Sequence, residues 1–122
     1  MLDHVTIGVI DLARSTQFYD QALLPLDITR LYGEGERFAG YGIRPKAFFW
    51  IGCRDMPQTG AHIAFVAPDR ETVERFYEAA IKAGGRDNGR PGPRPHYHPH
   101  YFGAFVLDPD GHNIEAVCHL PR

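Results

Sequence analysis

The chain repeats its own pattern at one constant offset, and this repeat restricts the possible folds more than any other feature of the sequence. The segment HVTIGVID, which begins at His4, corresponds to HIAFVAPD, which begins at His62. The same alignment continues without a gap through a matched acidic residue, an aromatic pair and an apolar pair: Asp11 with Asp69, Phe18-Tyr19 with Phe76-Tyr77, and Ala22-Leu23 with Ala80-Ile81. Chance can produce one such match, but all of them in one register indicate two copies of one module. We place the seam near Asp55–Gly60, which divides a single domain (residues 1–122) into modules 1–55 and 60–122.

Each copy begins with a short β-branched run and then changes its hydrophobic period. In the second copy the apolar residues fall on one face of a helix, at Val73, Phe76, Tyr77, Ala80 and Ile81. Asp69 is placed to accept hydrogen bonds from the N–H groups of the first turn, and Gly84-Gly85 can end the helix. Asp11 and Pro25 bracket the helix of the first copy in the same way.

Short strand-like runs follow each helix. We expect strands at roughly Ile28–Tyr32, Arg37–Ile43, Ala47–Cys53, Tyr101–Leu107 and His112–His119. The segment from Asn88 to Pro99 is rich in Pro and Gly and is typical of a loop, with one further strand expected after Gly92. The pattern therefore predicts an α+β fold made of two βαβββ modules.

Composition excludes several classes of function. The net charge is −2 and the basic residues are scattered, so we expect neither a nucleic-acid partner nor a membrane-surface partner. No apolar run approaches the roughly 18 residues that a membrane span requires. Cys53 and Cys118 lie outside any CxxC-like cluster, so we expect unpaired thiols on the helix-facing side of the sheets and a cytoplasmic protein.

Strand alternation places three potential metal ligands opposite the helix-packing faces. On the first strand Val5, Ile7 and Val9 form the apolar face, whereas His4 shares the other face with Thr6. His62 on the strand after the seam and Glu115 on the last strand also lie opposite the apolar side chains. Two imidazoles and one carboxylate suit a divalent first-row ion and leave coordination positions open. The alternative is that all three are ordinary polar residues of half-exposed sheets.

These features together resemble the vicinal oxygen chelate superfamily, which comprises glyoxalases, bleomycin resistance proteins and extradiol dioxygenases. The resemblance rests on the His-led strands, the Asp-capped helices carrying Phe-Tyr, and the closing motif DPDGHNIE from Asp108 to Glu115, and it covers nearly the whole chain. It implies paired modules that form a cleft-shaped half-open barrel, usually in homodimers. It also implies one divalent metal ion (Mn, Fe, Ni or Zn) bound by His4, His62 and Glu115.

One position departs from the glyoxalase I pattern. When the final strands of the two modules are aligned, Trp50 stands opposite Glu115, where glyoxalase I proteins carry a fourth ligand. Because indole cannot coordinate a metal, the resemblance favours the His-His-Glu members, such as extradiol dioxygenases and fosfomycin-modifying transferases. Trp50 and Phe48 would then form an aromatic wall for a substrate, with Thr6 on the same side. The alternative for both aromatic residues is plain core packing.

The histidine-rich segment RPHYHPHY supplies candidates for proton transfer. An imidazole can donate or accept a proton near neutral pH, so we take His98, His100 and Tyr101 as the catalytic candidates. The extradiol signature is incomplete, because Phe105 occupies its Tyr position. The alternative is a solvated loop. We expect His112 and His119 at the surface, and we expect Asp108 to Gly111 to form the turn between the last two strands.

The sequence leaves two functions open. The first is a metal-dependent enzyme, such as a lyase, isomerase, transferase or ring-cleaving dioxygenase, whose small substrate chelates the metal through vicinal oxygens. The second is a non-catalytic binder of the bleomycin-resistance kind. Metal content distinguishes them, since such binders lack the His-His-Glu set. In either case a small molecule is the expected partner and a homodimer the expected assembly.

Overall fold

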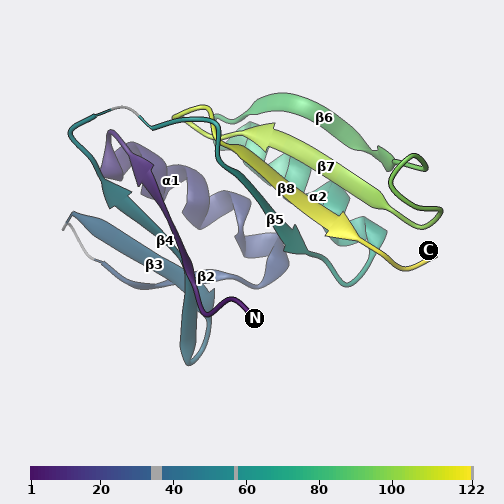
Figure 1. The fold of residues 1–122 in the computed structure, drawn as a ribbon, viewed down its shortest axis with the longest axis horizontal. Coiled ribbons are helices and arrows are strands. Elements are labelled where there is room, and N and C mark those ends of the chain that lie inside the picture. The colour runs from purple at the N-terminus through teal and green to yellow at the C-terminus, as the bar shows by residue number, and fades with distance from the viewer. Residues whose placement is uncertain (34–36, 57, 122) are drawn as a thin grey trace.

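The computed structural model of the chain describes residues 1–33, 37–56 and 58–121. Two sets of elements follow one another in the same order. The first set is β1 (Val5–Val9), α1 (Leu12–Ala22), a 3₁₀ turn (Leu24–Leu26), β2 (Thr29–Tyr32), β3 (Phe38–Ile43) and β4 (Lys46–Cys53). The second set is β5 (His62–Val66), α2 (Arg70–Lys82), β6 (Arg86–Pro93), β7 (Phe102–Leu107) and β8 (Asn113–Cys118). The predicted α+β fold with two βαβββ modules is confirmed (Figure 1).

The two sheets have the same topology. Their strand orders are β1-β4-β3-β2 and β5-β8-β7-β6, so the strand that opens each module pairs in parallel with the strand that closes it. In the described ranges no strand of one sheet is hydrogen-bonded to the other sheet, so the barrel is not closed. The register pairs Thr6 with Trp50 and Ala64 with Glu115. Trp50 is therefore the structural counterpart of Glu115, as the repeat alignment predicts.

The core lies between the sheets and the helices. Each helix packs on its own sheet, and α1 and α2 also contact each other. Phe49 of β4 and Phe65 of β5 meet edge to face with ring centroids 5.3 Å apart, so the aromatic core is continuous across the two modules. Both cysteines are free, as predicted. Cys118 is buried in the core, whereas Cys53 is half-buried at the end of β4.

The prediction of a loop from Asn88 to Pro99 is partly wrong. A strand begins at Arg86 and continues to Pro93, and no separate strand follows Gly92 in this segment. Among the described strands β6 is an edge strand whose one partner is β7, and its register shifts twice, between Asp87 and Gly89 and between Gly89 and Gly92. An edge strand tolerates proline and glycine because one side of its backbone needs no partner strand. The prediction from composition therefore missed this strand, which is stabilised by its pairing with β7.

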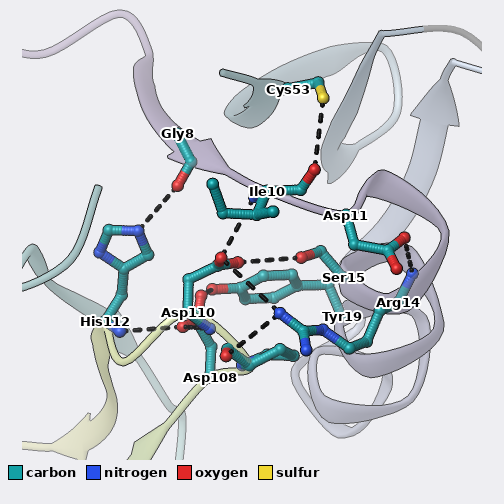
Figure 2. A network of polar contacts seen from close by, with 11 residues as sticks. Gly8, Ile10, Asp11, Arg14, Ser15, Tyr19, Cys53, Asp108, Asp110 and His112 are labelled. Atoms are coloured by element: carbon teal, nitrogen blue, oxygen red, sulfur yellow. Dashed lines mark hydrogen bonds and ion pairs between the residues drawn. The ribbon is translucent and has the colours of Figure 1, made fainter. Parts of the chain in front are cut away.

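The turn between β7 and β8 joins the two modules through a polar network (Figure 2). Asp108 and Gly111 do form the predicted turn, and Gly111 has a φ of 86°, which favours glycine. The Asp108 carboxylate also accepts a hydrogen bond from the Tyr19 hydroxyl of α1. Asp110 accepts hydrogen bonds from the Ile10 N–H (3.1 Å) and the Ser15 hydroxyl (3.3 Å).

His112 belongs to the same network, and its predicted surface position is wrong. Its side chain is 2% exposed. Nδ1 accepts a hydrogen bond from the Ala61 N–H (3.1 Å), and Nε2 therefore carries the proton that is donated to the Gly8 carbonyl (2.9 Å). Backbone groups of β1 and of the residue before β5 satisfy both ring nitrogens, which is why this imidazole can be buried.

None of the helices in the described part of the chain is long and apolar enough to span a membrane.

Candidate metal centre and adjoining cavity

Glu115 is a buried carboxylate at the centre of the second sheet. It lies on β8, between β5 and β7, and is 1% exposed. Its Oε1 lies 2.7 Å from Nε2 of His62, and its Oε2 accepts a hydrogen bond from the Tyr101 hydroxyl. Among the described residues no lysine or arginine pairs with this carboxylate. Two polar partners thus offset the cost of its burial.

His62 and Glu115 present one nitrogen and one oxygen donor side by side. The His62 side chain is 52% exposed, so the pair is open to solvent on the His62 side. Strand alternation predicted that both side chains point away from the helix-packing face, and their direct contact agrees with that geometry. An exposed imidazole beside a buried carboxylate forms half of a site that suits a divalent first-row ion.

Tyr101 links Glu115 to the histidine-rich segment. Burial, and after it the hydrogen bond to Glu115, raises the pKa of the Tyr101 phenol above its usual range, so the hydroxyl stays protonated at neutral pH. Its ring meets the rings of His98 and His119 edge to face, with centroids 5.4 Å away in both cases. The sequence suggested Tyr101 as a proton donor but gave no sign of its contact with Glu115.

His98 and His119 form a hydrogen-bonded pair. The His100 N–H donates to Nδ1 of His98 (3.0 Å), so Nε2 of His98 carries the proton that is donated to Nδ1 of His119 (2.8 Å). His100 contributes its backbone N–H to this pair, and its side chain is exposed. His119 is exposed, as predicted, but its role as the partner of His98 was not apparent from the sequence.

His4 immediately precedes β1 of the first sheet, apart from the other two predicted ligands. Its Nδ1 is 2.7 Å from Oδ1 of Asp3, and Nζ of Lys46 donates to the same oxygen. The Lys46 and His4 contacts lower the pKa of the Asp3 carboxyl. Within the described ranges, no three His, Cys, Asp or Glu side chains are close enough to share one ion. One chain therefore brings His62 and Glu115 together and leaves His4 outside the pair.

Two cavities lie beside these residues. A groove of about 490 Å³ runs between β1 and β5, and His4, Phe48 and His62 are among the residues that line it. A second cavity, of about 640 Å³, lies over the first sheet and is lined by Thr6 and Trp50. The predicted substrate residues Thr6, Phe48 and Trp50 thus belong to two different cavities.

Comparisons with known proteins agree with this architecture. A sequence model described as "Glyoxalase/Bleomycin resistance protein/Dioxygenase superfamily" matches residues 1–116. The chain is similar to the crystal structure of a glyoxalase/bleomycin resistance protein from Albidiferax ferrireducens T118, with 29% identity, a TM-score of 0.84, and coverage of 98% of this chain and 99% of that one. A comparison with curated proteins found no match.

Two fosfomycin resistance proteins share the fold. FosX from Mesorhizobium loti is 24% identical, with a TM-score of 0.71 and coverage of 98% of this chain and 92% of that one. A variant of FosX from Listeria monocytogenes, complexed with Mn(II) and 1S,2S-dihydroxypropylphosphonic acid, is also 24% identical. Its TM-score is 0.70, with coverage of 95% of this chain and 87% of that one.

Proposed function

The chain belongs to the glyoxalase/bleomycin resistance protein/dioxygenase superfamily, and from this premise we propose that it is a metal-dependent enzyme whose small substrate chelates the metal through vicinal oxygens. The buried Glu115 carboxylate beside the half-exposed His62 imidazole is the observation that carries the proposal. In the fold relative from Listeria monocytogenes, a protein of this architecture is complexed with Mn(II).

The donor set of this chain fits such an ion. Glu115 and His62 supply adjacent oxygen and nitrogen donors, and a cation would replace the imidazole as the partner of the buried carboxylate. A third donor is still required, because the described part of one chain holds no three-residue cluster. His4 remains the predicted third ligand. We propose that it comes from a second copy of the chain in a homodimer.

The surface around the groove between β1 and β5 supports a homodimer. Leu2, Ile43 and Val66 line this groove and are 86%, 54% and 73% exposed. Exposed apolar side chains that gather in one groove are typical of a surface that another chain covers. β1 and β5 are also edge strands of their sheets. His4 and His62 both line the groove, so a second copy seated there would lie beside both predicted ligands.

In this proposal a bound divalent ion supplies Lewis-acid polarisation of the substrate oxygens. The residues of the chain hold and orient the reacting groups. The Tyr101 hydroxyl holds one oxygen of Glu115, which leaves the oxygen beside His62 for the ion. His98 and His119 lie against the Tyr101 ring, and an imidazole can both donate and accept a proton. Proton transfer is common to the lyase, isomerase, transferase and dioxygenase reactions expected from the sequence.

Metal binding by purified protein tests the proposal. Protein freed of metal and reconstituted separately with Mn, Fe, Ni and Zn should bind at least one of these ions at one per chain, as measured by calorimetry and elemental analysis. His62→Ala and Glu115→Ala should each weaken this binding at least a hundredfold. His96→Ala is the matched control, since His96 is exposed and contacts only the Tyr97 ring among the described aromatic pairs. If none of the four ions binds stoichiometrically, the chain is a ligand-sequestering protein instead.

A mixture of two variants, each of which lacks one of the predicted metal ligands, tests whether the site is shared between chains. His4→Ala keeps His62 and Glu115, whereas Glu115→Ala keeps His4. In a mixed dimer, one of the two shared sites regains all three ligands. Unfolding and refolding the two variants together should therefore restore metal binding to about a quarter of the sites, with neither variant binding alone. If the three ligands came from one chain, the mixture would bind no metal.

A further inference from the structure

The cavity over the first sheet has a positively charged rim. Among the described residues that line it are four basic side chains, His4, Arg37, Lys46 and Arg54, and no acidic one. Lys46 is paired with Asp3 (2.6 Å), and Arg37 lies 4.0 Å from the exposed Asp55. The remaining cation, Arg54, has no carboxylate of the described residues within ion-pair distance. The only hydrogen bond of its guanidinium among those residues is to the Cys53 carbonyl (3.3 Å).

Gly52 lines this cavity, and two further glycines, Gly8 and Gly40, lie on the neighbouring strands β1 and β3. Gly8 and Gly52 are register partners on β1 and β4. The side chains of Gln58 and Arg54 lie over Gly8, and the Arg54 guanidinium lies over Gly52. A Cβ on Gly52 would come within 2.8 Å of an Arg54 guanidinium nitrogen. On β3, a Cβ on Gly40 would meet the indole of Trp50 at 2.7 Å. The glycines thus allow the Arg54 guanidinium and the Trp50 indole to approach the strands closely, where a larger side chain would fill the space.

The aromatic part of the cavity is held in place by its neighbours. The Trp50 indole stacks on Tyr32, with ring centroids 5.7 Å apart and an interplanar angle of 13°. Phe38 packs against the same indole at 5.9 Å. Trp50 is nevertheless only half-buried and lines the cavity. A flat apolar surface therefore lies next to a guanidinium that has no carboxylate partner among the described residues.

We propose that this cavity recognises a planar aromatic oxyanion, an aryl carboxylate or aryl phosphonate. Arg54, assisted by Arg37, binds the anionic group, and Trp50 packs against the aromatic ring. A guanidinium matches carboxylate and phosphonate oxygens through paired N–H donors, and an indole offers area without costing conformational freedom. This inference rests on the proposed function only in that it takes the bound molecule to be the substrate.

Fluorescence of Trp50 tests the inference directly, because Trp50 is the only tryptophan of the chain. Chelator-treated protein is titrated with benzoate and with phenylphosphonate. Two control compounds are titrated in parallel: benzamide, an uncharged analogue of benzoate, and methylphosphonate, an anion without an aromatic ring. Benzoate or phenylphosphonate should change the emission saturably, and benzamide and methylphosphonate should each bind at least tenfold more weakly. Added KCl should weaken the binding of the anions and leave benzamide unaffected.

Two variants and a control identify the anion-binding residues. Arg54→Gln should weaken anion binding at least tenfold, and Arg37→Gln should weaken it by a smaller factor. Arg75→Gln on α2 is the control, since its guanidinium bonds to Thr72 away from the cavity. Circular dichroism checks that each variant is folded. Equal binding of benzoate and benzamide, or equal anion binding by the Arg54 and Arg75 variants, would overturn the inference.

The two proposals fail in different ways. The fluorescence titration uses metal-free protein, so its result does not depend on whether His62 and Glu115 bind an ion. Anion binding without metal binding would retain the cavity as the recognition site of a ligand-sequestering protein. Metal binding without anion binding would overturn the cavity inference alone.

Discussion

Glu115 is the residue whose environment most requires a functional explanation. Its carboxylate is 1% exposed and contacts an imidazole and a phenol, with no lysine or arginine paired to it among the described residues. Both partners can be structural, since they satisfy both oxygens. They also leave the carboxylate able to bind a cation, because the half-exposed His62 side chain can give up its hydrogen bond to Glu115 and bind the same cation as Glu115. Measurements that separate metal affinity from folding distinguish these roles.

Tyr101→Phe is the sharpest such measurement. The substitution removes the hydroxyl that holds Oε2 of Glu115 and keeps the ring that packs against His98 and His119. We expect metal affinity to fall by about tenfold to a hundredfold, which is typical when an outer partner of a metal ligand is lost. Tyr97→Phe is the matched control, because Tyr97 packs on the Tyr101 ring but is itself exposed. Equal metal affinities of the two variants, measured by calorimetry, would show that the Tyr101 hydroxyl does not orient the ligand.

At the level of elements, strand alternation could predict which side chains share a face within one sheet. Alternation placed His62 and Glu115 on one side of the second sheet, and they contact each other there. Strand alternation contains no information on how the two sheets are placed relative to each other, so it did not predict that His4 and Lys46 both contact Asp3. The repeat alignment paired Trp50 with Glu115, and the strand register has the same pairing.

The elements that the sequence misplaced depend on contacts between distant segments. β6 looked like a loop because its prolines and glycines are acceptable only at a sheet edge beside β7. His112 looked exposed because a lone histidine in a turn usually is, yet β1 and the segment before β5 satisfy its ring nitrogens. The basic side chains around the cavity over the first sheet were not predicted either, since Arg37, Lys46 and Arg54 are scattered along the chain. Alternating glycines on β1, β3 and β4 were the available sign of it.

Tyr19 connects α1 to the turn between β7 and β8, and its removal should weaken the junction of the modules. Tyr19 is fully buried and its hydroxyl donates to Asp108, which is 1% exposed. Tyr19→Phe leaves that carboxylate oxygen without its donor, so the free energy of unfolding should fall by about 1–3 kcal/mol. Urea unfolding at pH 7 measures the change. Tyr41→Phe is the control, because its hydroxyl donates to Asp20, whose side chain is 37% exposed and can turn to water. A loss for Tyr41→Phe as large as that for Tyr19→Phe would contradict this account.

At the scale of the whole molecule, buried tyrosines make the free energy of unfolding depend on pH in the alkaline range. Burial is the first cause that raises the pKa values of Tyr19, Tyr41 and Tyr101 above the usual range, and a neighbouring carboxylate adds to it in each case. In the unfolded chain these phenols titrate near pH 10. Above that pH the unfolded state releases protons that the folded state keeps. The stability contribution of each phenol is thus complete below about pH 10 and is lost as the pH rises toward the folded pKa.

The free energy of unfolding should therefore change little between pH 7 and 9 and fall steeply above about pH 10. Each phenol that is ionised only in the unfolded state contributes about 1.4 kcal/mol per pH unit to the slope. Tyr19→Phe removes one such phenol, so this variant should be less stable than the wild type at pH 7 but lose stability more slowly from pH 10 to 11. Tyr32→Phe removes an exposed phenol and should keep the wild-type slope. Urea unfolding at intervals from pH 7 to 11 gives all three curves. If the Tyr19→Phe curve runs parallel to the wild type above pH 10, the Tyr19 phenol does not hold its proton in the folded protein.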